Sequence, residues 1–264
     1  MHKLATTLAA LSFALASAAA VNAEPAAKAA AKPATPPNTL TAKEKASGWR
    51  LLFNGKTSKG WRGFNLAKFP EEGWQIKDGL LVKVPPATPG KSFGGDIVTE
   101  EEFDSFEVAW EFRLTPGANG GLKYLVDEKL VKDSKNGVSF EFQLLDDDKH
   151  PDAKKGKDGN RKCGALYDLI APKEAAAKPI GEWNEARLVV EGNKVEHWLN
   201  GKKVVEFERG SDALKMLIAD SKYKAIPGFG EAGKGRLLLQ DHFNEVAYRN
   251  MKVRKLPGTK TASR

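Results

Sequence analysis

Period-two alternation of apolar and polar residues is the feature that most limits what this chain can fold into. Residues 106–114 read Phe-Glu-Val-Ala-Trp-Glu-Phe-Arg-Leu, and segments 139–144, 186–191 and 194–199 alternate similarly. Such alternation is typical of strands with one buried face. Helical pattern is confined to 211–222, with a further turn expected at 173–177. The sequence therefore predicts an all-β protein, a concanavalin-like or jelly-roll sandwich of two antiparallel sheets with one or two short helices.

The two ends of the chain differ in composition from this strand-rich part. Residues 1–23 have the charged, apolar and small-residue order of a secretory signal peptide. Residues 24–46 are mostly Ala, Pro, Lys and Thr, which predicts a disordered tether. We expect a single β-sandwich domain over 47–256 and a short basic tail over 257–264. No transmembrane segment is expected once the signal peptide is removed.

The charge distribution bears on partners and on the compartment. The net charge is +8, but residues 47–251 contain 32 basic and 32 acidic side chains, so the basicity lies at the ends. A neutral folded part gives no support for nucleic-acid binding. Cys163 is the single cysteine of the chain, so no intrachain disulfide can form. Together with the signal peptide this predicts an exported bacterial protein, periplasmic or secreted, whose oligomeric state the sequence leaves open.

Strand parity selects the first candidate functional residues. Glu111 lies on the polar face of the strand over 106–114, and Glu141 and Gln143 lie on the polar face of the strand over 139–144. If the two strands are neighbours, these three side chains form one polar patch. The alternative is a solvated outer face with ion pairs.

Two strand ends carry further polar groups. Asp146 and His150 belong to an acidic loop directly after the second of those strands, and are candidate ligands of a divalent metal cation or acid–base groups. A solvated loop is the alternative, because the spacing matches no standard metal motif. Near the C-terminus, Gln240 and His242 share one face of the strand that begins at residue 236.

Many motifs, taken together, resemble one known family. They include Trp49-Arg50-Leu51-Leu52-Phe53-Asn54-Gly55, Trp74-Gln75-Ile76-Lys77-Asp78-Gly79, Asn119-Gly120-Gly121-Leu122-Lys123-Tyr124, Glu141-Phe142-Gln143-Leu144, Gly164-Ala165-Leu166-Tyr167-Asp168, Leu239-Gln240-Asp241-His242 and Tyr248-Arg249-Asn250. Their order is similar to that of the 3-keto-disaccharide hydrolase family (3-keto-glucoside 1,2-lyase or 3-keto-2-hydroxyglucal hydratase domains). The resemblance covers about residues 48–256.

The resemblance implies an enzyme that cleaves glycosides already oxidised to a ketone at carbon 3. The ketone acidifies the hydrogen on carbon 2, so a base can form an enolate and the group on the anomeric carbon leaves; overall hydrolysis and 1,2-elimination both fit. The family pattern implies Glu141 or His242 as the base, with Lys123, Gln143, Gln240 or a divalent cation polarising the carbonyl. It also implies a set of substrate-binding residues: Glu111, Asn119, Tyr124, Gln143, Tyr167, Gln240 and Arg249.

The chain departs from the family pattern in places, and two other functions remain open. Gly120 replaces a usual Ser, Leu125 replaces the Arg of a Tyr-Arg pair, and Phe243 stands where many relatives have Gly. One alternative function is a non-catalytic, lectin-like carbohydrate-binding domain. The other is an ordinary glycosidase that uses Glu111 and Glu141 as a carboxylate pair.

Overall fold

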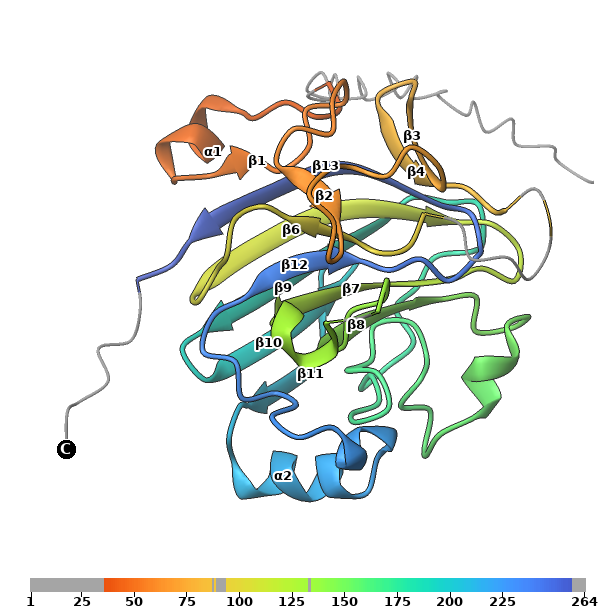
Figure 1. Cartoon of the computed structure of the whole chain (residues 1–264), viewed down its shortest axis with the longest axis vertical. Coiled ribbons are helices and arrows are strands. Elements are labelled where there is room, and N and C mark those ends of the chain that lie inside the picture. The colour runs from red at the N-terminus through yellow and green to blue at the C-terminus, as the bar shows by residue number, and fades with distance from the viewer. Residues whose placement is uncertain (1–35, 87, 89–93, 133, 258–264) are drawn as a thin grey trace, which may run out of the picture. The chain divides into compact units, whose positions relative to one another are not determined.

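The computed structural model describes residues 36–86, 88, 94–132 and 134–257, and within these residues the strands form two antiparallel sheets (Figure 1). The larger sheet contains, in spatial order, β11 (Lys202–Glu208), β10 (Lys194–Leu199), β9 (Asn184–Glu191), β6 (Phe106–Leu114), β13 (Val246–Lys255), β4 (Leu80–Lys83) and β3 (Trp74–Lys77), with β1 (Arg50–Leu51) also paired to β13. The smaller sheet contains β2 (Trp61–Gly63), β5 (Ile97–Thr99), β12 (Arg236–Leu239), β7 (Asn119–Val126) and β8 (Phe140–Leu145).

Few helices accompany the sheets in the described residues. They are α1 (Ala42–Ala46), α2 (Asp212–Ala219) and the short 3-10 helices η1 (Glu128–Val131), η2 (Pro151–Lys154) and η3 (Lys222–Ala225). The prediction of an all-β sandwich with one or two short helices is thereby confirmed. None of the helices in the described ranges is both long enough and apolar enough to span a membrane.

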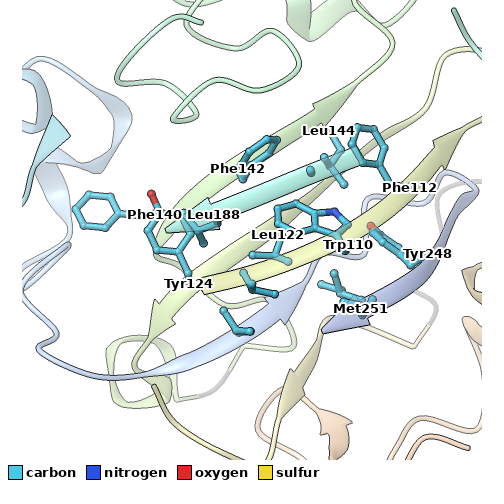
Figure 2. Packing of buried hydrophobic residues seen from close by; sticks show 14 of the residues in the cluster. Trp110, Phe112, Leu122, Tyr124, Phe140, Phe142, Leu144, Leu188, Tyr248 and Met251 are labelled. Atoms are coloured by element: carbon cyan, nitrogen blue, oxygen red, sulfur yellow. The ribbon is translucent and has the colours of Figure 1, made fainter. Parts of the chain in front are cut away.

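The core lies between the two sheets and is built by the alternation seen in the sequence. Every second side chain of β6 and of β8 points inward, so that Trp110 and Phe142 pack edge to face with ring centroids 5.1 Å apart (Figure 2). Such aromatic pairs add to the stability gained from burying apolar surface. Because successive residues of a strand point to opposite faces, the neighbours of these aromatics point away from the core.

The two segments expected to be helical differ in outcome. Ser211 caps α2 by accepting a hydrogen bond from the backbone N–H of Leu214, as the sequence predicted, although the helix ends at Ala219. The prediction of a helical turn at 173–177 is wrong, since this segment has no helical structure. Its run of alanines favours a helix, but it lies next to β11, where Lys173 N–H donates to the carbonyl of Val204.

Part of the segment predicted to be a disordered tether belongs to the folded unit. Asn38 and Asn250 exchange backbone-to-side-chain hydrogen bonds of 2.6 and 2.9 Å, and Asn38 Nδ2 donates to the carbonyl of Gly79. A capping box formed by Thr41 and Glu44 begins α1. The low hydrophobicity of this stretch concealed these polar contacts, so the folded unit begins before the expected boundary at residue 47. The predicted signal peptide (1–23), the first part of the tether and residues 258–264 lie outside the described residues.

One histidine is part of the core. His197 on β10 has no exposed surface, and its Nε2 lies 2.9 Å from the hydroxyl of Tyr124. Its Nδ1 lies 3.2 Å from the carbonyl oxygen of Gly164. Burial lowers the pKa of His197 from 6.5 to about 4, so the imidazole is neutral in the folded state at neutral pH.

This buried imidazole predicts a loss of stability in acid. As pH falls below 6.5 the unfolded chain binds a proton at this site, whereas the folded chain does not until about pH 4. We expect the free energy of unfolding to fall by roughly 3 kcal/mol from this group alone between pH 7 and pH 4. Urea denaturation over that pH range measures the change. A double variant, His197→Phe with Tyr124→Phe, replaces both partners and should show a smaller dependence; an unchanged dependence would contradict the assignment.

Candidate functional site

The candidate site lies on the outer face of the smaller sheet, where β7 and β8 pair. Lys123 stands opposite Glu141 in this pairing, and Gly121 stands opposite Gln143. A pocket of about 170 Å³ opens over these strands. The segment over 222–226 forms part of its lining, and the charged and polar lining residues are Lys123, Ser139, Glu141, Lys222, Tyr223 and Gln240.

The Glu141 side chain can occupy its position only because Gly121 has no side chain. A Cβ atom added to Gly121 would lie 2.1 Å from Glu141 Oε1 and 2.8 Å from its Cδ. Gln143, in the amide orientation that satisfies both its polar atoms, donates to Glu141 Oε1 at 3.2 Å and to the carbonyl of Gly120 at 3.1 Å. The Glu141 carboxylate therefore lies over Gly121 and is held by the side-chain amide of Gln143.

Burial and the neighbouring positive charges have opposite effects on the pKa of the Glu141 carboxylate. Burial raises the pKa of Glu141, while the ammonium groups of Lys123 and Lys222 oppose that rise. Lys123 Nζ is 4.0 Å from Glu141 Oε2 and 3.9 Å from Asp96 Oδ2, and it donates to the carbonyl of Gly137 at 2.8 Å. A basic carboxylate next to a fixed ammonium group is an arrangement suited to proton transfer.

Asp96 supports Lys123 from below the pocket. It has no exposed surface, and burial raises its pKa. Its carboxylate accepts hydrogen bonds from the backbone N–H groups of Asp241 at 2.7 Å and Gly137 at 2.9 Å. These hydrogen bonds hold the Asp96 carboxylate in place, and that carboxylate in turn positions the Lys123 ammonium group.

Lys222 was missed by the sequence analysis, which placed it at the end of a helix. Its ammonium lies 4.1 Å from the ring centroid of Tyr167, over the ring face. Desolvation lowers the pKa of this ammonium even though the side chain as a whole is exposed. No periodic signal marks the residue, because it reaches the pocket from η3, which follows α2.

Gln240 and His242 follow β12, which ends at Leu239, so the strand expected to carry both residues is shorter than predicted. The backbone N–H of Gln240 donates to the carbonyl of Gly121, and its Oε1 is buried without a hydrogen-bond partner in the described part of the chain. His242 lies farther along, its ring centroid 5.5 Å from that of His150, and its buried Nδ1 also lacks a partner there. Asn119 pairs with Leu145 at this end of β7, and its N–H donates to Asn244 Oδ1.

The structure contradicts the expected patch of Glu111, Glu141 and Gln143. Glu111 is on β6 of the larger sheet and points to its outer face, whereas Glu141 points outward from the smaller sheet, so the core separates them. Arg249, also predicted to bind substrate, lies beside Glu111, with Nε 2.7 Å from Glu111 Oε2, and stacks on Trp183. Sequence parity identified outward-facing residues correctly but could not say in which sheet each strand lies.

The two predicted tyrosines have different positions. The prediction that Tyr124 binds substrate is wrong, because this residue has no exposed surface and its hydroxyl pairs with His197 in the core. Tyr167 adjoins the site: its N–H donates to the carbonyl of Glu141, and its hydroxyl donates to Asp152 Oδ2 at 2.7 Å. Burial and that carboxylate raise the pKa of Tyr167, so it stays protonated under the ring-stacked Lys222.

The acidic loop after β8 does not fit the metal site considered from the sequence. Asp146 Oδ2 accepts from the N–H of Gly117 at 2.7 Å, and Oδ1 accepts from the N–H groups of Asp148 and Lys149 at 3.2 Å. His150 Nδ1 accepts from the N–H of Asp152, and burial, followed by the neighbouring His242, lowers the His150 pKa. Within the described ranges no three His, Cys, Asp or Glu side chains converge in a metal-binding arrangement. Asp146 therefore organises the turn.

Two of the departures from the family pattern have structural explanations. A Cβ at Gly120 would point to the core, 3.2 Å from Val246 and 3.4 Å from the Tyr248 hydroxyl, so this change does not alter the pocket lining. Phe243 adopts φ +62°, in the region that favours glycine, and its side chain is exposed. Both substitutions leave Glu141 and Lys123 in place.

Fold and site together define a β-sandwich protein with a buried glutamate and two lysines in a polar pocket on the smaller sheet. The family of 3-keto-alpha-glucoside-1,2-lyase-like domains matches residues 48–254, and the chain belongs to this family. A 3-keto-disaccharide hydrolase of Bacteroides thetaiotaomicron is 36% identical over 233 residues, which are 80% of this chain and 79% of that protein.

Solved structures agree with this assignment. A candidate glycosyl hydrolase of Parabacteroides distasonis is 34% identical, with a TM-score of 0.72 over 84% of this chain and 100% of that one. A second from the same organism is 28% identical, with a TM-score of 0.59 over 79% of this chain and 99% of that one.

Proposed function

We propose that the protein cleaves glycosides whose sugar ring is oxidised to a ketone at carbon 3. The observation that supports this most is the position of Glu141, a buried carboxylate of raised pKa that lies 4.0 Å from the Lys123 ammonium in a polar pocket of about 170 Å³. Family membership favours the same chemistry. An exported location fits the predicted signal peptide and is part of this proposal.

The proposed reaction begins with proton transfer. Glu141 takes the hydrogen from carbon 2 of the sugar, and the electron pair of that bond forms the enolate of the neighbouring ketone. The enolate oxygen receives a hydrogen bond from Lys123, whose charge stabilises the developing negative charge in the low-dielectric pocket. Gln143 keeps the Glu141 carboxylate aligned.

Departure of the aglycone completes the cleavage. The ketone re-forms as a carbon–carbon double bond develops between carbons 1 and 2, and the bond from carbon 1 to the aglycone oxygen breaks. Lys222, whose pKa is lowered by desolvation, is placed to give a proton to that oxygen. Addition of water to the unsaturated sugar would make the overall reaction a hydrolysis. The free Oε1 of Gln240 can accept a hydrogen bond from a sugar hydroxyl.

A comparison of two substrates tests the proposal. A chromogenic glucoside and its 3-keto form carry the same aglycone, and we expect release above the enzyme-free rate only from the keto form. Deuterium at carbon 2 should slow that release because the carbon–hydrogen bond breaks. Equal release from both would instead support an ordinary glycosidase. Binding without release would support a lectin-like role.

A further inference from the structure

A second pocket, of about 510 Å³, lies between α2 and the chain around Phe229. A stacked pair of rings separates it from the candidate active site. Tyr223 lines the first pocket and Phe229 the second, and their ring centroids are 4.0 Å apart with an interplanar angle of 10°. A ligand in the second pocket would not occupy the site around Glu141, so its binding is independent of the proposed function.

The pocket contains a buried guanidinium without an acidic partner. Arg209 is 8% exposed, and its terminal nitrogens donate to the carbonyls of Gly192 and Ala232. Its Nε has no hydrogen-bond partner, and no carboxylate among the residues that the structure describes lies within ion-pair distance of it. Burying a charged donor group without a counter-charge is costly, so an anion bound here would be stabilised.

The rest of the lining has an excess of positive charge and an apolar wall. Lys215 and Lys224 line the pocket against one acid, Glu231, and Lys215 also pairs with Asp212 outside it. The apolar part of the lining comes mainly from Leu214, Ile218 and Phe229. A ligand that matches both parts has an anionic end and an apolar body.

We propose that this pocket binds a carboxylate attached to an apolar, ring-sized body. The carboxylate lies toward Arg209 and Lys224, and the body packs on Ile218 and Phe229. The terminal nitrogens of Arg209 already donate to two backbone carbonyls, so the guanidinium attracts the carboxylate through its charge, together with the ammonium of Lys224.

Titration of the full chain with a fluorinated benzoate, followed by fluorine NMR, tests this proposal. The uncharged benzamide of the same shape is the matched probe. We expect the benzoate to bind and the benzamide to bind at least about tenfold more weakly, because only the benzoate supplies the missing charge. Lys224→Glu should weaken benzoate binding by about tenfold, and Ala219→Trp, on the exposed side of α2, should remove it by filling the pocket.

Two controls separate this result from general effects of charge and of helix substitution. Lys68→Glu changes an exposed lysine outside the lining of both pockets, and Ala213→Trp adds the same bulk to α2 outside the lining. Both should bind benzoate as the parent chain does. Absence of benzoate binding, equal binding of the two probes, or equal weakening by the controls would overturn the proposal. So would loss of benzoate binding in Lys123→Gln, since this lysine lies in the other pocket.

Discussion

Replacement of Glu141 by glutamine is expected to lower kcat on a 3-keto glucoside by about 10²–10⁴-fold, the usual contribution of a positioned general base. Glutamine has nearly the same shape and keeps the contact over Gly121, but it cannot accept the proton from carbon 2. Substrate binding should change little, so KM should stay near that of the parent enzyme. In the parent enzyme the rate should also fall as pH decreases through the raised pKa of Glu141, because only the ionised form is a base.

Glu111→Gln is the matched control for this measurement. It makes the same chemical change in the other outward-facing glutamate, which lies on the outer face of the larger sheet and pairs with Arg249. We expect its kcat to equal that of the parent enzyme. Comparable losses in both variants would contradict the assignment of Glu141, and an unchanged kcat in Glu141→Gln would favour His242, the other base considered from the sequence.

The second large decrease in kcat is expected from a substitution at Gly121, although this residue has no side chain that could contact the substrate. Alanine there would place its Cβ 2.1 Å from Glu141 Oε1, so the carboxylate must move. A displacement of about 1 Å in a reacting group can reduce the rate by about 10²-fold. We therefore expect Gly121→Ala to lower kcat by about that factor while the fold is retained, as circular dichroism and thermal denaturation would report.

Gly233→Ala is the control, because a Cβ at Gly233 meets nothing within 4 Å. A double variant tests whether Gly121→Ala lowers kcat by displacing Glu141. If Gly121→Ala acts by displacing Glu141, then adding it to Glu141→Gln should cause little further loss, since the two changes remove one function. If the decrease in kcat of the double variant equals the product of the two single decreases, Gly121→Ala acts in a way that does not involve Glu141.

Much of the fold could be predicted because alternation determines which side chains face the core. Phe106, Trp110, Phe140 and Phe142 lie between the sheets as their parity requires. Residue 124 shows the limit of motif comparison, because Tyr124 belongs to the same alternating set as Leu122 and is buried with it. Parity within β7 contains that information, whereas the family motif assigned the residue to the site.

The sequence by itself determined that Glu141 and Gln143 face away from the core, since side-chain direction along a strand is a local property. Only the tertiary structure decided that β6 and β8 belong to different sheets, which separates Glu111 from Glu141, and that η3 brings Lys222 to the pocket. Strand order and the approach of a distant segment depend on packing among residues far apart in the chain. Because no short window of sequence contains those contacts, local patterns predict the faces of the strands but not how the site is assembled from them.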